Sequence, residues 1–462
     1  MSVVDDMKIK DTLIIFTRYP EPGNVKNRLI PVLGKDGAAA LQNDMVKHTL
    51  KTARDFATTD GIVLEVHYNG GDERKMEALL GTELSFIPQE GIDLGEKMHA
   101  SFLRAFTGGS QRVVLIGTDC PGITTAILRQ AFSALKGCDC AIGPSADGGY
   151  YLIGLKGPIP DIFRSIPWGT GKVLKHTYEI IKGIGLQAVL LDRLSDIDRP
   201  EDLPSWHEAA KARSLPMISV IIPAIDEKTF IRKTLKSALA GKNVEVIVAD
   251  GGSIDGTREL SASLGARVVP TCKGRAAQMN EGVGHALGDI LLFVHADSVL
   301  PRGYDDAIRS ALADSDVAAG AFSLSFHEGD FVMDLIAFGA NLRSRYLKLP
   351  YGDQGFFVRK GTFHNAGGFP EVPIMEDVAF IRAMHETGRV VTLKSKVTTS
   401  SRRFQAISPF RALVLNQLAM VGFFLGMPID DLAVLYRSRE RSIGIWMKQL
   451  IIAAKKRITR RA

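Results

Sequence analysis

The chain has 462 residues, of which 45% are hydrophobic and 23% are charged, and its formal net charge is +6. This length exceeds what one ordinary core needs, so we expect two or three domains. The composition excludes a mainly disordered protein. Much of the positive charge lies at the C-terminus, so the overall charge does not indicate a nucleic-acid partner, and we expect none.

The cysteines and the apolar stretches indicate a cytoplasmic protein. The four cysteines show no paired metal-ligand spacing, as is typical of a reducing compartment. Residues 1–11 are polar and contain acids, unlike a signal peptide. The longest apolar stretch without charge, 412–427, is shorter than the ~18–20 residues of a membrane-spanning helix.

Short apolar runs alternate with helical patterns along the chain. This alternation predicts βαβ units with a largely parallel sheet, and therefore an α/β fold. The first half predicts strands at 12–17, 62–68, 113–117, 139–143 and 150–154, and helices near 36–57, 93–107, 124–136 and 171–184.

Polar clusters in the first half suit a nucleoside triphosphate. Lys26 and Arg28 follow a Pro/Gly loop after the first strand, which fits a triphosphate cradle although a solvated basic turn would look the same. The loop lacks the Gly-Lys-Ser/Thr ending of a Walker A motif. Asp119 follows a buried strand, which can present a carboxylate to a phosphate-bound metal. Asp196 and Asp198 are either metal ligands or caps of a short helix.

Together these motifs resemble, over about residues 11–205, the transferases of the first type associated with radical-SAM/selenodomain clusters. That family is similar to the molybdenum-cofactor and phospholactate guanylyltransferases. The resemblance implies metal binding by Asp119, with Asp198 as a second carboxylate. It implies phosphate binding by Lys26 and Arg28, and a substrate pocket shaped by Asp147 and the two glycines after it.

A boundary is expected near residues 210–216. Residues 205–216 are polar and contain no strand pattern, and Ser214-Leu215-Pro216 precedes a new apolar strand. We therefore expect a nucleotidyltransferase-like domain at 1–212, a second α/β domain at 213–405 and a basic helical extension at 406–462.

The second half restarts the alternation of strands and helices. It predicts strands at 218–222, 244–249, 266–269 and 289–294, helices at 227–240, 257–264 and 275–286, and late helices at 408–427 and 430–453.

Four clusters in this half suit a nucleotide diphosphate. The first is the Pro223-Ala224-Ile225-Asp226-Glu227 segment, and the second is Asp250 with Asp255 in a Gly-rich loop, where a carboxylate can accept hydrogen bonds from a base or ribose. The third cluster consists of basic and amide side chains at the start of a predicted helix, which suit a diphosphate: Lys273, Arg275 and Gln278. The fourth is His295-Ala296-Asp297, a candidate Mg²⁺ or Mn²⁺ site.

A paired acid, Glu376-Asp377, begins a helical segment at 378–386 and could act as the general base toward an acceptor hydroxyl. Each cluster alone has a simpler explanation: a turn for the Gly-rich loop, a hydrogen-bonded loop residue for His295, and a helix-terminal charge pair for the two acids. Their occurrence in this order favours the functional interpretation.

The order resembles a family 2 glycosyltransferase of the GT-A fold over about residues 217–440. The match is closer to a subgroup associated with arsenosugar biosynthesis or with radical-SAM/selenodomain clusters, the second type. The motifs that carry it are Gly-Arg-x-x-Gln-Met-Asn at 274–280, Leu-Phe-x-His-Ala-Asp at 292–297, Gly-Asp-Gln at 352–354, Met-Glu-Asp at 375–377 and Arg-Arg-Phe-Gln at 402–405.

This resemblance implies a role for each motif. Asp250 would contact the base, Asp297 would hold the metal, and Asp377 would be the catalytic base. Arg402 and Arg403 would face the diphosphate or the acceptor. Two departures are present: Asp226 stands where the family usually has Asn, and His295 stands where the first Asp of a DxD motif would be.

The C-terminal segment mixes apolar residues with Lys448, Lys455, Lys456 and Arg457. Such a basic amphipathic helix is typical either of a packed terminal helix or of contact with the inner face of an anionic membrane.

We therefore expect a metal-dependent, inverting glycosyltransferase with a nucleotide-sugar donor and a small-molecule or lipid acceptor. The first domain would use an NTP to make the activated donor, or would be a non-catalytic nucleotide-binding module. A carboxylate at Asp250 suits uracil and also guanine N–H groups, so the base stays open.

Overall fold

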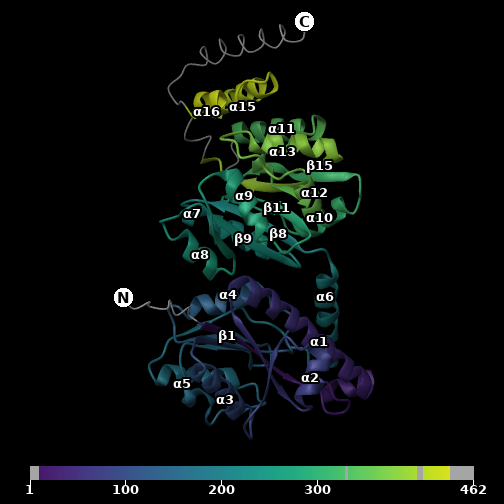
Figure 1. The fold of residues 1–462 in the computed structure, drawn as a ribbon, viewed down its shortest axis with the longest axis vertical. Coiled ribbons are helices and arrows are strands. Elements are labelled where there is room, and N and C mark those ends of the chain that lie inside the picture. Colours follow the sequence, from purple (N-terminus) through teal and green to yellow (C-terminus); the bar gives the residue numbers. More distant parts are fainter. Residues whose placement is uncertain (1–9, 328–330, 403–408, 438–462) are drawn as a thin grey trace, which may run out of the picture. The chain divides into compact units, whose positions relative to one another are not determined.

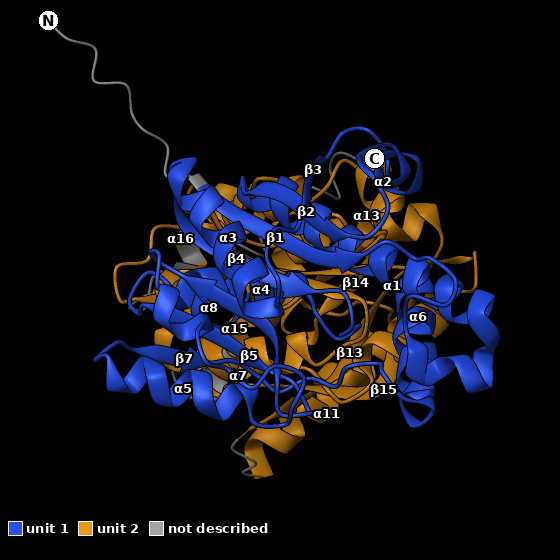
Figure 2. Ribbon diagram, turned by 90° about the horizontal axis from the view of Figure 1, so that it is seen from below, with its two compact units in different colours: residues 1–215, 262–265 blue, residues 216–261, 266–462 orange. Residues whose placement is uncertain are grey.

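The computed structural model describes residues 10–327, 331–402 and 409–437. The chain divides into two compact units, residues 1–215 with 262–265 and residues 216–261 with 266–462 (Figure 2). Each unit is an α/β structure built on one sheet (Figure 1). Within the described ranges, no helix is long and apolar enough to cross a membrane.

The first unit has a seven-stranded mixed sheet. Only β6 runs antiparallel to its neighbours, β4 and β5, while the other paired strands are parallel. The C-terminal ends of β1 and β4 therefore meet at one edge. In spatial order the strands are β3 (Ser85–Pro88), β2 (Val63–Asn69), β1 (Lys10–Arg18), β4 (Ser110–Gly117), β6 (Tyr150–Leu155), β5 (Cys140–Pro144) and β7 (Ala188–Leu190).

Helices pack on both faces of this sheet because its central strands are apolar on both sides. Along β1, Leu13 and Ile15 belong to one core with side chains of α1 and α4, whereas Ile14 belongs to the opposite core with α3 and α5. The helices are α1 (Ile30–Asp60), α2 (Glu73–Leu80), α3 (Leu94–Thr107), α4 (Thr125–Ala134), α5 (Val173–Gly183) and α6 (Leu203–Ser214).

The second unit has an eight-stranded mixed sheet. Its strands β9, β8 and β11 pair in parallel, and β14 then runs antiparallel between β11 and β13. In spatial order the strands are β10 (Arg267–Pro270), β9 (Val244–Asp250), β8 (Ile218–Ala224), β11 (Ile290–Phe293), β14 (Phe356–Arg359), β13 (Val317–Phe326), β15 (Arg389–Thr399) and β12 (Ser298–Val299).

An aromatic cluster joins this sheet to two of its helices and to the loop between them. Phe293 of β11, Phe363 of α12, Phe369 of the loop and Phe380 of α13 are all buried, and the ring centroids of Phe369 and Phe380 lie 4.3 Å apart. The helices of the unit are α7 (Lys228–Leu239), α8 (Thr257–Ser263), α9 (Arg275–Gly284), α10 (Tyr304–Leu312), α11 (Phe331–Tyr346), α12 (Lys360–Asn365), α13 (Glu376–Thr387), α15 (Pro409–Phe424) and α16 (Ile429–Arg437).

The expected fold class, tandem α/β domains followed by helices, is confirmed. The expected largely parallel sheet is only partly right, because both sheets are mixed. Only residues 145–149 separate β5 from β6, too few for the crossover that a parallel pair requires, so the two strands pair as a hairpin. The polar segment 205–216 is mainly the helix α6. Domain limits at 212 and 405 stay a prediction.

Gly320 should be intolerant of any side chain. It pairs with Phe357 across β13 and β14, and an added Cβ would lie 2.2 Å from Cζ of that fully buried ring. We expect Gly320→Ala to lower the free energy of unfolding by about 1–3 kcal/mol, because the ring cannot move away. Urea denaturation measures this loss. The control, Gly284→Ala in α9, meets nothing within 4 Å and should leave stability unchanged or slightly higher. Equal stability of the two variants would contradict the argument.

Candidate active site

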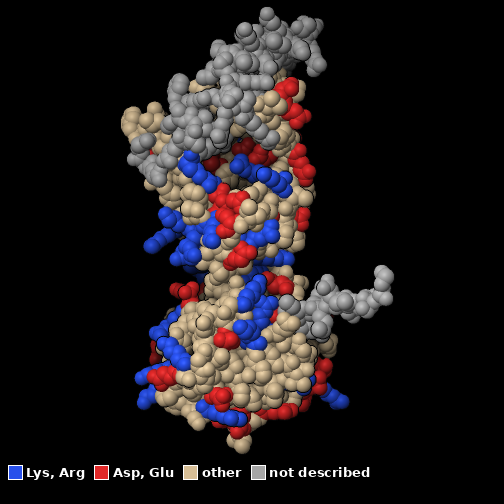
Figure 3. Space-filling view, turned by 90° about the vertical axis from the view of Figure 1, so that its left-hand side faces the viewer, with Lys and Arg blue, Asp and Glu red and all other residues tan. Residues whose placement is uncertain are grey.

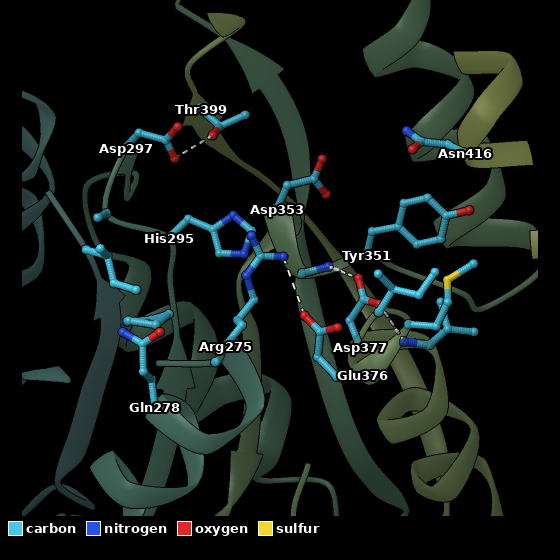
Figure 4. A pocket seen from close by; sticks show the side chains of 18 of the residues that line it. Arg275, Gln278, His295, Asp297, Tyr351, Asp353, Glu376, Asp377, Thr399 and Asn416 are labelled. Carbon is cyan, nitrogen blue, oxygen red and sulfur yellow. Dashed lines mark hydrogen bonds and ion pairs between the residues drawn. The ribbon is translucent and has the colours of Figure 1, made fainter. Parts of the chain in front are cut away.

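A cavity of about 850 Å³ opens at the C-terminal ends of β8 and β11 in the second unit. Parallel pairing of these strands brings Pro223, near the end of β8, and Asp297, in the loop after β11, to the same edge of the sheet. Asp297 and Asp377 lie on opposite sides of the cavity, with His295, Arg275 and Asp353 between them (Figure 4). Acidic and basic side chains gather around a hollow in the upper part of Figure 3.

Asp297 is held by a guanidinium. Nε of Arg402 lies 3.0 Å from its carboxylate, and the hydroxyl of Thr399 donates to the same group. Arg402 also forms a bidentate ion pair with Glu227, at 2.6 and 2.8 Å, and stacks on the ring of Phe230. Hydrogen bonding to Glu227 raises the pKa of Arg402 above its usual value. Arg402 therefore pairs with two acids of the cavity wall, Asp297 and Glu227.

Asp377, at the start of α13, is fixed by two backbone amides, one from its own helix and one from Gly352. Its carboxylate accepts hydrogen bonds from the N–H of Gly352, at 2.9 Å, and of Val378, at 2.8 Å. Gly352 lies between His295 and Asp377, since a Cβ there would meet both side chains at about 3.5 Å. These bonds aim the Asp377 carboxylate into the cavity from a defined position.

Glu376 is the more buried of the two adjacent acids, with only 7% of its surface exposed. Burial, and then the charge of Asp377, raise the pKa of Glu376 above its usual value. Arg275, at 3.4 Å, opposes this rise but is half exposed. Glu376 therefore pairs with Arg275, whereas the carboxylate of Asp377 lines the cavity.

The α9 cluster divides into two kinds of contact. Lys273 and Arg275 line the cavity at the start of the helix, where backbone N–H groups also point outward. Gln278 lines the cavity too, but its amide nitrogen donates to the carbonyls of Ala224, at 3.0 Å, and Ala249, at 2.8 Å. Gln278 thus ties the ends of β8 and β9 together.

Asp250 does not line the cavity. Its carboxylate is fully buried and accepts hydrogen bonds from the amides of Gly252 and Ser253 and from Arg258. Burial alone would raise the pKa of Asp250, but the bonds from Ser253 and Arg258 outweigh it and lower the pKa. In this state Asp250 shapes the Gly-rich loop, and its assignment to the base stays a prediction.

Asp226 and Asp255 also stabilise this loop from outside the cavity. Asp226 has a left-handed backbone, with φ of 53°, which Asn and Asp tolerate better than most residues. Its carboxylate accepts from the amide of Ile254 at 2.9 Å, so the Asp that replaces the usual Asn is accommodated. Asp255 accepts from the amides of Lys228 and Thr257. Arg403 lies outside the described residues.

The residues around Asp297 could hold a divalent metal only if the substrate supplies further ligands. Among the described residues, no group of three or more His, Cys, Asp or Glu side chains could hold a metal. Asp297 offers one carboxylate, with His295 beside it on the same loop. Mg²⁺ and Mn²⁺ can be held by one or two protein carboxylates when substrate phosphates and waters complete the shell.

The candidate groups of the first unit form two ion pairs. Nζ of Lys26 lies 2.8 Å from Asp119 and donates to the carbonyl of Ile197 at 2.7 Å, while Arg28 pairs with Asp198. The N–H of Ile197 donates to the carbonyl of Asp119, so the loop that contains Asp198 lies against the Asp119 loop.

The remaining acids of the first unit belong to neighbouring turns. Asp147 accepts hydrogen bonds from Ser145 and from the amide of Gly149, which closes its turn. Burial, followed by the charge of Asp147, raises the pKa of Asp196. The structure therefore brings the sequence-predicted acids of this unit near one another.

Several cavity residues carry no sequence signal. Asn416 and Met420 of α15 and Tyr436 of α16 line it from segments more than 100 residues beyond Asp297. Tyr351 was part of no motif, although it precedes Gly-Asp-Gln. Its ring covers the guanidinium of Arg343 at 3.3 Å, and burial raises its pKa to about 12. The neighbouring Gly-Asp-Gln motif was the only signal that could have located it.

Comparison with known proteins gives each unit a family. Residues 219–369 match the family described as "Glycosyl transferase family 2", and residues 52–170 match "Uncharacterized protein conserved in bacteria (DUF2064)". The chain is a fusion of a DUF2064 domain and a family 2 glycosyltransferase domain. The cavity lies in the family 2 domain and in the helices that follow it.

The chain is similar to a glucosyl-3-phosphoglycerate synthase of Mycolicibacterium paratuberculosis, with 34% identity over 121 residues. That match covers 23% of the chain and 36% of the relative, so the chain spans about a third of this curated protein.

Two solved structures are also similar. A nucleotide-diphospho-sugar transferase described as putative, from Desulfovibrio desulfuricans G20, has 36% identity, a TM-score of 0.42, and coverage of 45% of this chain and 90% of its own. The glucosyl-3-phosphoglycerate synthase of Mycobacterium tuberculosis, in complex with Mn²⁺, UDP and glucosyl-3-phosphoglycerate, has 19% identity, a TM-score of 0.34, and coverage of 47% and 83%.

Glu376 should make the stability of the protein depend on pH. A raised pKa in the folded state means that ionised Glu376 destabilises the fold at neutral pH, and that this effect is absent below the unfolded pKa of about 4.3. We expect Glu376→Gln to raise Tm at pH 7 but not at pH 4, because the half-exposed Arg275 contributes little. Glu386→Gln, exposed on the same helix, is the control. A uniform shift at both pH values would contradict the explanation.

Proposed function

We propose that the family 2 domain transfers a sugar from a nucleotide sugar to an acceptor hydroxyl, with inversion at the anomeric carbon. The observation that carries this proposal is the separation of two carboxylates, Asp297 and Asp377, across one cavity whose walls include Lys273, Arg275 and Arg402. With Asp377 as the base, one direct displacement accounts for the inversion.

Asp377 would accept the proton of the acceptor hydroxyl. The acceptor oxygen then bonds to the anomeric carbon as the bond from that carbon to the phosphate oxygen breaks, and the nucleoside diphosphate leaves with the electron pair. Lys273 and Arg275, with the amides that begin α9, would hold the diphosphate. Glu376 would position Arg275.

Mg²⁺ or Mn²⁺ at Asp297 would neutralise charge on the departing diphosphate. Arg402 already compensates the charge of Asp297, so the metal would bind there together with the diphosphate and not alone. The relative from Mycobacterium tuberculosis was solved with Mn²⁺ and UDP. The donor base, uracil or guanine, stays open, as do a small-molecule and a lipid acceptor.

The test of this function separates the two carboxylates. We expect Asp377→Asn to lower kcat by about 10²–10⁴-fold, because the base is lost, while nucleotide binding persists. Asp297→Asn should instead weaken Mn²⁺-dependent nucleotide binding by at least about tenfold. Calorimetry with UDP and GDP, with and without Mn²⁺, and a donor-turnover assay measure the two effects.

The control is Asp306→Asn, on α10 and outside the cavity, which should leave both readouts unchanged. Loss of nucleotide binding in Asp377→Asn, or full turnover by that variant, would overturn its role as the base.

For the DUF2064 domain we propose nucleotidyl transfer that makes an activated sugar, in line with its resemblance to guanylyltransferases. Lys26 and Arg28 would hold the triphosphate, with Asp119 and Asp198 as metal carboxylates and Asp147 at the substrate pocket. The two ion pairs support this proposal, since each basic group lies next to a candidate metal carboxylate. The alternative is a non-catalytic nucleotide-binding module.

Asp119→Asn separates these alternatives in the full chain. If the domain is catalytic, the wild type should release pyrophosphate from an NTP and a sugar phosphate with Mg²⁺, and the variant should be slower by at least about tenfold. Glycosyl transfer from a supplied nucleotide sugar should not change. No pyrophosphate from the wild type with any of the four NTPs would favour the non-catalytic module.

A further inference from the structure

Helix α11 is amphipathic in an unusual sense, because its large apolar side chains point away from the sheet. Asn341 bonds both backbone groups of Leu324 on β13, and Ser344 bonds Thr392 on β15, which fixes the inner side of the helix. The inner side is otherwise built mostly of small residues: Met333, Ala337 and Ala340. The outer side carries Phe331, Leu335, Phe338 and Leu342, with exposed fractions of 83, 60, 64 and 48%.

A helix that only covers a sheet has the opposite distribution, with its large apolar residues inside. Here four large side chains at helical spacing form one exposed stripe, which Tyr346 extends in the last turn and Leu347 just after it. Contiguous exposed apolar surface of this kind marks an interaction site.

The stripe continues onto α15, which packs against α11. Leu413, Val421 and Phe424 of α15 are exposed, and Asn416 and Met420 of the same helix line the cavity. By helical spacing these residues lie on neighbouring parts of the helix surface, so α15 contributes both to the cavity and to the apolar surface.

Charge on α11 is acidic at its start and positive at its end. Asp334 is exposed in the first turn, and Arg345 and Lys348 are exposed at the end of the helix. The sequence from Arg437 to Arg461, which continues from α16, contains nine Lys and Arg residues and one acid, Glu440. An anionic lipid surface complements both the apolar stripe and this charge. A second copy of the chain would bring the same positive charge against itself, which disfavours self-association.

We propose that the outer sides of α11 and α15 dock on an anionic lipid bilayer, with Phe331, Leu335 and Phe338 inserted at the boundary between headgroups and acyl chains. The proposed surface consists of described residues of α11 and α15. One consequence rests on the proposed function: because α15 also walls the cavity, an acceptor hydroxyl on a membrane lipid would approach Asp377 from the docked side.

Vesicle co-sedimentation of the full chain tests the docking without donor, metal or acceptor. We expect the wild type to sediment with vesicles of phosphatidylcholine and phosphatidylglycerol, and less with phosphatidylcholine alone. The double variant Leu335→Ser/Phe338→Ser should bind the mixed vesicles about tenfold or more weakly, because two apolar side chains no longer insert. Both positions are more than half exposed, so an unchanged Tm should show that the variant folds.

The matched control is Leu103→Ser/Ile184→Ser, which removes two apolar side chains of 48 and 44% exposure from the first unit. It should bind like the wild type. Equal binding by the α11 variant, or no binding by the wild type at low salt, would overturn the proposal. A concentration-dependent dimer in light scattering that the α11 variant loses, without vesicle binding, would assign the surface to a second copy instead. None of these outcomes depends on glycosyl transfer, so failure of the proposed function is distinguishable.

Discussion

The amide of Gln278 is the contact on which the geometry of the cavity depends. Its nitrogen donates to the carbonyl of Ala224, the last residue of β8, and to the carbonyl of Ala249, one residue before the end of β9. The side chain is almost fully buried, so the two bonds are protected from water. They fix the starting points of two loops, one leading to Asp226 and Glu227 and the other beginning at Gly251. The same helix begins with the basic groups of the cavity, so strand ends and cations are positioned by one element.

Much of this arrangement could be predicted from the sequence. Apolar runs that end in an acid located Asp119 and Asp297, because a buried strand must be apolar and its end reaches the edge of the sheet. Motif order then placed Lys273, Arg275, Glu376 and Asp377 in one domain, and the structure gathers these four around one cavity. The prediction that the loops after these strands meet depends on parallel pairing, because parallel strands end at the same edge of the sheet.

Other parts could not be predicted, for identifiable reasons. The partner of Asp250 is Arg258, and nothing in the Asp-Gly-Gly-Ser pattern shows that this carboxylate turns inward toward its own loop. Asn416 and Tyr436 come from helices whose position depends on tertiary packing alone. The helical pattern of residues 331–346 is apolar on most sides, so periodicity could not show which side of α11 meets the sheet.

The pairing of Arg402 with Asp297 and Glu227 has a consequence for the order in which ligands bind. A lone metal ion that approaches Asp297 meets a carboxylate whose charge is already compensated, so it gains less than it would at a free acid. A metal ion that arrives with a diphosphate brings an anion that can replace Asp297 as a partner of the guanidinium. If Asp297 holds the metal as proposed, the ion pair would act as a cation-exchange site with a preference for the metal–nucleotide complex over the bare ion, and its selectivity would come from the anion rather than from the size of the metal.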